Sequence, residues 1–242
     1  MKQFLELIES FKQVQDTQSL NVLLKKFAVL IESEHFALGM SYPTSLMQSE
    51  VTLLHNYPQG WMQYYMDQNY QEVDAVVKHS ISNHSPILWE HINKGNGFKK
   101  EQLSIMDQAS GAGLKKGFSV PIHGLRGEFG ILSFSQTDLS PKTNTLYESI
   151  IPYTQLLIPA LTDAIQRIRK AHPETLVSLT KREKECLSWV TEGKSSWEIS
   201  QILGCAERTV IFHLNNAMAK LNATNRYQAI SKAIIHGILV PH

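Results

Sequence analysis

Residues 207–213 read Glu-Arg-Thr-Val-Ile-Phe-His, and this stretch decides how the C-terminal part of the chain is interpreted. It opens a segment in which apolar side chains recur every three or four residues, the spacing of one helix face. These apolar residues are Val210, Leu214, Ala217, Met218 and Leu221. The connection in front of the segment, Gly204-Cys205-Ala206, has only three residues. Because a short turn with glycine between two short helices is typical of a helix-turn-helix, residues 207–213 are predicted to begin a recognition helix that enters the major groove of DNA.

Two capping boxes mark the starts of the preceding helices. Thr180 is followed three residues later by Glu183, and Ser195 by Glu198. At this spacing each side chain bonds the free backbone N–H of the other residue. A fourth helix is expected at about residues 225–236. The C-terminal part is therefore predicted to be an all-α four-helix unit.

The recognition helix leaves several side chains facing away from its apolar stripe. Cations among them suit phosphates, an amide can read a base edge, and an aliphatic group can pack on a thymine methyl. The predicted DNA-binding residues are Arg208, Thr209, Ile211, Asn215 and Lys220. From residue 176 onward eight Lys and Arg outnumber five Asp and Glu, in a chain of net charge +1. This asymmetry favours a nucleic-acid domain joined to a different domain; the alternative is a four-helix unit for protein contact.

Length and composition fit a globular protein of one large domain or two smaller ones. The chain has 242 residues, 43% of them hydrophobic. No apolar run is long enough to span a bilayer, and residues 1–9 read as an amphipathic helix and not as a signal peptide. The two cysteines, Cys186 and Cys205, lack the spacing of metal ligands and are expected to be free thiols. We therefore expect a cytoplasmic protein without a membrane segment or a metal site.

The longer N-terminal part mixes helical and strand-like patterns. A long helix is expected at residues 141–170, followed by a polar, proline-containing linker at 171–178. Further helices are expected at about 3–14, 18–33, 60–69, 74–83 and 99–113, and strands at 36–41, 51–56, 117–122 and 129–134. We predict an α+β protein, with an α/β/α sandwich over an antiparallel sheet in domain 1–170 and the four-helix helix-turn-helix domain in 179–242.

Residues 57–89 are dense in large side chains with a polar tip. The aromatic residues are Tyr57, Trp61, Tyr64, Tyr65, Tyr70 and Trp89, with Asp74 among them. Trp61 and Tyr65 share one helix face because they are four residues apart. An apolar pocket with a few directed polar contacts needs such a face. An aromatic-rich core whose polar tips bond the backbone needs it equally, so the residues alone leave both interpretations open.

Both halves of the chain resemble LuxR-type quorum-sensing regulators. The C-terminal resemblance to the LuxR-type helix-turn-helix covers about residues 179–239 and rests on Leu179-Thr180-x-Arg182-Glu183-x-Glu185, Gly193-Lys194-Ser195-Ser196-x-Glu198-Ile199, Thr209-Val210-x-Phe212-His213 and Lys220-Leu221-x-Ala223-x-Asn225-Arg226. The N-terminal resemblance to the autoinducer-binding domain rests on the order and spacing of Trp61, Tyr65, Asp74, Trp89 and Gly117.

The resemblance implies that the ligand is an N-acyl-homoserine lactone and that no cofactor is needed. Trp61 would donate its indole N–H to the lactone carbonyl, and Asp74 would accept the amide N–H of the ligand in a charge-assisted bond. Tyr57 and Ser133 would donate to the acyl carbonyl. Trp89 would pack against the lactone ring. The acyl path would be lined by Tyr65, Leu38, Val76, Leu114 and Ile131, and Gly117 would meet a backbone requirement.

The resemblance further implies a ligand-responsive transcription factor that binds promoter DNA as a homodimer, with the helix at 141–170 as part of the dimer contact. The sequence departs from the family pattern at Ala75, where proline usually follows the aspartate, and at Ala206, where serine usually caps the recognition helix. Ile211 stands where a polar or basic residue is more usual. These departures bear on ligand preference and on DNA sequence preference.

Three other functions are alternatives. The first is an orphan regulator of the same type that answers another small molecule or acts without ligand. The second is a response regulator, but residues 1–40 begin with helices and lack the early acidic pair of a receiver domain. The third is an enzyme such as a lactone hydrolase, but the ten histidines are scattered without metal-ligand spacing, and Ser133 lacks the glycine pattern of a nucleophile elbow. We therefore expect a non-enzymatic protein.

Overall fold

A computed structural model describes residues 2–94, 98–124, 126–137, 141–171 and 177–240 of the chain. The chain divides into two compact units. The first contains residues 1–41, 51–124 and 128–172, and the second contains residues 42–50, 125–127 and 173–242. Most of the predicted linker, residues 172–176, lies outside the described residues, so its bounds stay a prediction. Each unit is described by itself below.

The first unit is built on a mixed-length antiparallel sheet. Its strands are β1 (His35–Pro43), β2 (Ser49–His55), β3 (Ile87–Leu88), β4 (Lys116–His123) and β5 (Phe129–Gln136). The order across the sheet is β2-β1-β5-β4-β3. The pairs β1–β5, β4–β5 and β3–β4 are antiparallel. The predicted antiparallel sheet and the hairpin that joins its last two long strands are therefore confirmed.

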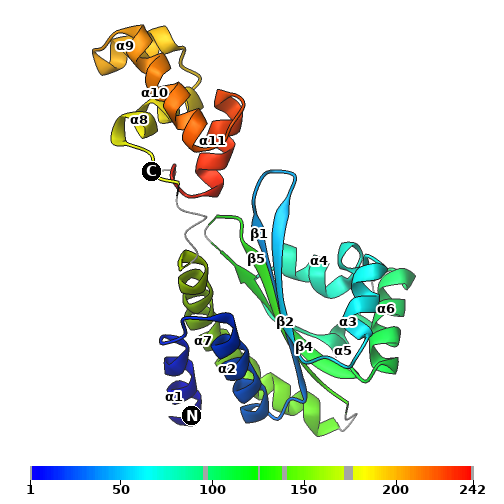
Figure 1. Ribbon diagram of the computed structural model, residues 1–242. Helices are drawn as coiled ribbons and strands as arrows, with labels where there is room; N and C mark the ends of the chain where they lie inside the picture. Colours follow the sequence, from blue (N-terminus) through cyan, green and yellow to red (C-terminus); the bar gives the residue numbers. More distant parts are fainter. Residues whose placement is uncertain (1, 95–97, 125, 138–140, 172–176, 241–242) are drawn as a thin grey trace. The chain divides into compact units, whose positions relative to one another are not determined.

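Helices cover both faces of this sheet, as Figure 1 shows. On one face lie α1 (Lys2–Phe11), α2 (Thr17–Leu30) and α7 (Pro141–Lys170). On the other lie α3 (Trp61–Asp67), α4 (Ala75–Ser82), α5 (Trp89–Lys94) and α6 (Lys100–Gly111), with a short 3₁₀ turn, η1, at Tyr70–Glu72. The predicted α/β/α sandwich is confirmed.

Alternation along β4 and β5 gives the two faces of the sheet different chemistry, because successive strand residues point to opposite sides. Phe118 and Phe134 face α7 and α2, with their ring centroids 5.5 Å apart. The Tyr147 ring of α7 packs 4.9 Å from that of Phe118, and the Phe27 ring of α2 packs 5.6 Å from that of Phe134. This face forms a packed aromatic core. The opposite face carries small and polar residues, such as Gly117 and Ser133, under α3–α6.

The long helix α7 joins this core to the N-terminal helices. It runs for 30 residues and continues through Pro152 and Pro159. The Arg167 guanidinium donates to the Phe11 carbonyl oxygen at 2.6 Å and so ties α7 to the end of α1. No helix in the described ranges combines the length and the apolar character that crossing a membrane requires.

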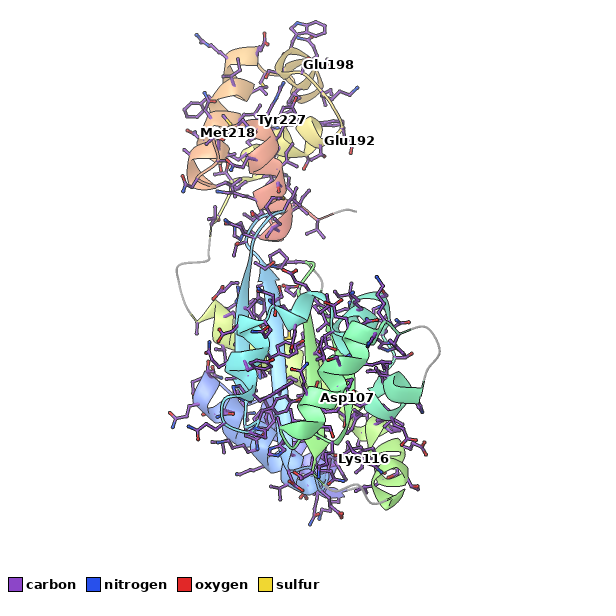
Figure 2. All side chains as sticks on the ribbon, turned by 90° about the vertical axis from the view of Figure 1, so that its right-hand side faces the viewer. Asp107, Lys116, Glu192, Glu198, Met218 and Tyr227 are labelled. Atoms are coloured by element: carbon purple, nitrogen blue, oxygen red, sulfur yellow. The ribbon has the colours of Figure 1, made fainter. Side chains whose placement is uncertain are left out.

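The second unit contains the four predicted helices. They are α8 (Lys181–Thr191), α9 (Ser196–Leu203), α10 (Glu207–Lys220) and α11 (Arg226–Ile235). Both predicted capping boxes are present: Thr180 pairs with Glu183 and Ser195 with Glu198, and Glu198 is labelled at the start of α9 in Figure 2. The recognition helix α10 begins after Ala206 without a side-chain cap. Such a missing cap costs about 0.5–2 kcal/mol relative to Ser.

Some elements differ from the sequence-based prediction. The strand β3, the helix α5 and the turn η1 were not predicted, and α1 ends at Phe11 although the helical pattern continues to residue 14. β3 has only two residues, Ile87 and Leu88, which pair with Ser119 and Phe118 of β4. A strand of two residues is too short to show the alternation of apolar and polar residues by which strands are predicted. Its pairing with β4 is what makes it a strand.

Candidate ligand pocket and nucleic-acid interface

A pocket of about 590 Å³ lies in the first unit between the sheet and the helices α3, α4 and α6. Its volume falls in the range of small-molecule sites, about 300–1,000 Å³. The seven predicted ligand-binding residues all line it: Tyr57, Trp61, Tyr65, Asp74, Val76, Trp89 and Ser133. Segments far apart in the sequence thus meet at one cavity. For these residues the structure agrees with an apolar pocket rather than a filled aromatic core.

Asp74 is the charged group of the pocket. It is only 8% exposed and is the N-cap residue of α4, where its Oδ1 accepts from the Val76 backbone N–H at 2.7 Å. Its Oδ2 accepts from the Tyr65 hydroxyl at 2.7 Å. Burial raises the pKa of Asp74, and these two hydrogen bonds oppose the rise. Since a carboxylate offers about four lone-pair sites, Asp74 can still accept from a ligand.

Trp61 and Tyr57 supply hydrogen-bond donors to the same cavity. Trp61 is the first residue of α3 and is buried. Within the described residues its indole N–H has no hydrogen-bond partner. Burial raises the pKa of the Tyr57 hydroxyl far above its ordinary value, with the Ser133 hydroxyl opposing the rise, so Tyr57 keeps its proton. Both groups are donors that a carbonyl oxygen in the pocket could use.

Trp89 lines the pocket, where a hydrogen bond holds its indole and a glycine leaves room for its ring. Its indole Nε1 donates to Ser119 Oγ at 2.9 Å, and Ser119 Oγ lies 2.8 Å from Ser133 Oγ. A Cβ added to Gly117 would lie 2.8 Å from the Trp89 ring and 2.6 Å from the Phe134 carbonyl oxygen. Only glycine leaves room for the ring at this point of the sheet. The expectation that Gly117 answers a backbone requirement agrees with this close approach.

The rest of the pocket wall is mainly apolar. Val76, Leu114 and Ile131 line it as expected, but Leu38 does not. Strand alternation explains this error: Leu38 pairs with Leu132 on the face that packs under α7. Sequence analysis also missed several lining residues: Met40, Met62, Met66, Met106 and Phe129. Two of them could have been predicted from the sequence, because Met62 and Met66 directly follow Trp61 and Tyr65, which were expected to line the pocket.

Two of the aromatic residues lie outside the pocket. Tyr64 is 44% exposed, and the hydroxyls of Tyr64 and Tyr70 each donate to Gln108 Oε1 at 3.0 Å. They fasten α3 and η1 to α6. Neither the pocket nor the core interpretation describes this pair, because neither ring is buried and both hydroxyls bond a side chain.

No metal centre accompanies the pocket in the part of the chain that the structure describes: three or more His, Cys, Asp or Glu side chains nowhere gather closely enough to hold an ion. His84 and His123 pack ring to ring with centroids 4.3 Å apart. This pair lies on the surface, apart from the residues that line the pocket.

The recognition helix α10 of the second unit separates a buried face from an exposed one. The apolar residues Val210, Leu214, Ala217 and Leu221 are buried against α8, α9 and α11, while Met218 is partly buried. Figure 2 labels Met218 on α10 and Tyr227 on α11. The predicted DNA contacts Arg208, Ile211, Asn215 and Lys220 are exposed, and Thr209 is half-buried. All five remain predictions of DNA contact.

Lys220 has a structural partner that the sequence did not reveal. Its Nζ donates to Oε2 and Oε1 of Glu183 at 2.8 and 2.9 Å. Glu183 is buried at the start of α8, where it also completes the capping box. Burial acts to raise the pKa of Glu183, but the bonds from Lys220 and Thr180 outweigh it, so this pKa lies below its ordinary value. The ion pair joins the end of α10 to the start of α8.

Comparison with known proteins bears on both units. Residues 16–165 match the family model "Autoinducer binding domain", and residues 177–233 match "Bacterial regulatory proteins, luxR family". The chain is 42% identical over 233 residues to the transcriptional activator protein LuxR of Aliivibrio fischeri, which covers 96% of this chain and 93% of that protein. It is 41% identical over 244 residues to the transcriptional activator protein VanR of Vibrio anguillarum, with both chains covered completely.

A solved structure is also similar. The crystal structure of Escherichia coli SdiA matches with a TM-score of 0.84 and 25% sequence identity, and the match covers 99% of each chain.

The Glu183–Lys220 pair generates a stability prediction. We expect Lys220→Met to destabilise the second unit by roughly 1–3 kcal/mol, because it leaves a buried carboxylate without its cation. A carboxyl group with a lowered folded-state pKa contributes stability above its ordinary pKa, and this contribution is lost as pH falls through the lower folded value. The difference in the free energy of unfolding between variant and wild type should therefore be largest at neutral pH and become smaller in acid. Urea unfolding of the full chain, followed by the amide signals of α8 and α10, measures it.

The matched control is Arg208→Met. Arg208 is an exposed cation on the same helix, and no ion pair is recorded for it within the described residues. We expect its stability to stay within about 0.5 kcal/mol of wild type, as for most surface substitutions. Equal loss of stability in the two variants would contradict the role of the ion pair.

Proposed function

Because this chain belongs to the luxR family of bacterial regulatory proteins with an autoinducer-binding domain, we propose that it senses an N-acyl-homoserine lactone and binds promoter DNA as a homodimer. Its family consists of transcriptional regulators, so the expectations of a transcription factor and of a non-enzymatic protein are confirmed. Since the LuxR and VanR relatives are transcriptional activators by name, we propose activation as the output, in the cytoplasm where the DNA lies.

The observation that carries the ligand proposal is a buried carboxylate in a mainly apolar pocket. Asp74 can accept an N–H, while Trp61 and Tyr57 offer donors in the same cavity. An N-acyl-homoserine lactone has the complementary groups: one amide N–H, two carbonyl oxygens at its polar end, and an apolar acyl chain. The chain would lie along the wall that contains Val76, Met62 and Met66.

The structure weakens the main argument for the alternative, an orphan regulator with another ligand or none. That argument was Ala75, which stands where a proline would restrict the preceding aspartate. Asp74 is nevertheless held from both oxygens, by the Val76 N–H and by the Tyr65 hydroxyl. Ala75 itself is buried. The aim of the carboxylate therefore does not depend on a proline.

Ligand binding would act on DNA binding through folding and assembly. A ligand that binds only the folded state stabilises it by RT ln(1 + [L]/Kd), about 2.7 kcal/mol at a hundredfold excess over Kd. A dimer would then present two recognition helices to half-sites about one DNA turn apart. We propose α7 as part of the dimer contact, since Leu156 on this helix is 57% exposed.

On the DNA side, Arg208 would contact phosphate, Asn215 a base edge, and Ile211 a thymine methyl. Thr209, half-buried in the first turn of α10, would bond the phosphate backbone. Lys220 already directs two of its three N–H groups to Glu183, which leaves one for a phosphate.

Replacing Asp74 by Asn tests the ligand proposal. The neutral amide avoids the burial of a charge and can keep the bond to the Val76 N–H, so without ligand the thermal stability should stay within about 1 kcal/mol of wild type. Affinity for the lactone should fall roughly 10- to 100-fold, since a hydrogen bond to a charged group contributes about 1.5–3 kcal/mol. Lactone-dependent thermal shifts and reporter dose curves measure the two effects.

Asp107→Asn is the control, because this carboxylate is exposed on α6 of the same unit (Figure 2). It should leave both the stability and the dose curve unchanged. A wild-type dose curve in the Asp74 variant would count against the pocket assignment.

Replacing Asn215 by Ala tests the DNA assignment. Loss of a base contact should relax preference at one base pair and cost about 1–3 kcal/mol on the specific site only. Arg208→Ala should instead weaken binding to specific and scrambled duplexes about equally, with a shallower salt dependence. Titration of both duplexes at several salt concentrations separates the two roles; the same profile for both variants would refute this division.

A further inference from the structure

Ser119 lies directly behind the polar end of the pocket. It is fully buried in the middle of β4, where it pairs with Ser133 of β5. Both serines point to the same face of the sheet, but only Ser133 lines the cavity. Ser119 therefore meets the ligand pocket through Ser133 and not directly.

The hydrogen bonds of Ser119 have a fixed direction. The Trp89 indole is a donor only, so Ser119 Oγ must accept from it across the 2.9 Å contact. The remaining contact, 2.8 Å to Ser133 Oγ, could run either way. If Ser133 donated, the hydroxyl hydrogen of Ser119 would have no acceptor among the described residues, and a buried donor without an acceptor costs about 1–3 kcal/mol. Ser119 therefore donates to Ser133.

This direction decides what Ser133 can do. With one lone pair engaged by Ser119, the Ser133 hydroxyl keeps its own hydrogen for the pocket side, where the Tyr57 phenol also lies. We propose that Ser119 is a positioning residue. Because it accepts from the Trp89 indole, it donates its own hydrogen to Ser133, and the Ser133 hydroxyl is then oriented to donate to a carbonyl oxygen of the ligand. This proposal rests on the proposed lactone function and deepens it.

The consequence is a ligand preference at this end of the pocket. Trp61, Tyr57 and Ser133 all present donors there, and Asp74 presents the acceptor. The arrangement accepts a ligand with carbonyl oxygens next to a single N–H. A ligand with a methylene group in place of the acyl carbonyl would leave these donors without an acceptor and bind more weakly.

A double-mutant cycle tests the relay. Ser119→Ala should raise the Kd of the full-length chain for N-acyl-homoserine lactones, measured across a chain-length series, by about tenfold. In a Ser133→Ala background the same change should raise it less than about twofold, because residues in one network are not additive. Ser119→Thr, which keeps the hydroxyl, should restore a Kd within about threefold of wild type. Equal effects of Ser119→Ala in both backgrounds would overturn the proposal.

Ser80→Ala is the matched control. The Ser80 hydroxyl of α4 is also fully buried, but it has no hydrogen-bond partner within the described residues. Its removal should leave the lactone Kd unchanged. A loss equal to that of Ser119→Ala would show that removing any buried hydroxyl weakens binding, and would contradict the relay.

A measurement without ligand separates this proposal from the proposed function. The indole ¹H–¹⁵N signal of Trp89, assigned with a Trp89→Phe variant, should move and exchange faster with water in Ser119→Ala, but not in Ser119→Thr or Ser80→Ala. An unmoved signal in Ser119→Ala would refute the hydrogen-bond chain, whatever the lactone result. If wild type binds no lactone of the series, the proposed function fails, and the ligand preference inferred here fails with it.

Discussion

The pocket of the first unit depends on a buried carboxylate that has no cation partner among the described residues. Asp74 sits in an apolar surrounding that raises its pKa, and the Tyr65 hydroxyl and the backbone N–H groups of Val76 and Val77 oppose this rise. Burying a charge costs free energy unless it is well hydrogen-bonded. A further donor, such as a ligand amide, would therefore stabilise the carboxylate more inside the pocket than it would in water. Local instability at Asp74 and ligand affinity are thus two consequences of one arrangement.

The sheet keeps this charged pocket compatible with a stable fold by dividing its two faces. On the α7 side, Phe118 and Phe134 pack with Tyr147 in a closed aromatic core. On the other side the same strands carry Gly117, Ser119 and Ser133, whose small side chains leave space for the Trp89 ring and for the cavity. One face is filled by an aromatic core, and the other holds an apolar cluster around Trp61, Trp89 and Met106 together with the cavity. Because the two faces share strands, filling the cavity adds contacts to the same sheet that the core holds together.

Much of this architecture could be predicted from the sequence, where the signal is local. The pairs Thr180 with Glu183 and Ser195 with Glu198 fix helix starts by direct hydrogen bonds within four residues, and both were found. The short strand β3 was missed because its two residues are set by pairing with β4. Leu38 was wrongly expected in the pocket, because the apolar character of a strand residue does not reveal which face of the sheet it lies on. The Lys220–Glu183 pair and the Ser119 hydroxyl bring together residues distant in sequence, and no spacing rule reveals them. The ligand contacts themselves were inferred from a family resemblance, which the match to the autoinducer-binding domain and the likeness to LuxR and VanR support at the level of the domain.

The most direct test of the central claim is calorimetric titration of the full-length chain with an N-acyl-homoserine lactone and with the same lactone methylated at its amide nitrogen. Methylation removes the N–H that Asp74 would accept and leaves both carbonyl oxygens and the acyl chain in place. We expect the methylated compound to bind at least about tenfold more weakly in wild type, in line with the loss of a charge-assisted hydrogen bond, and to lose little further affinity in Asp74→Asn. Equal affinity of wild type for both compounds would contradict the account.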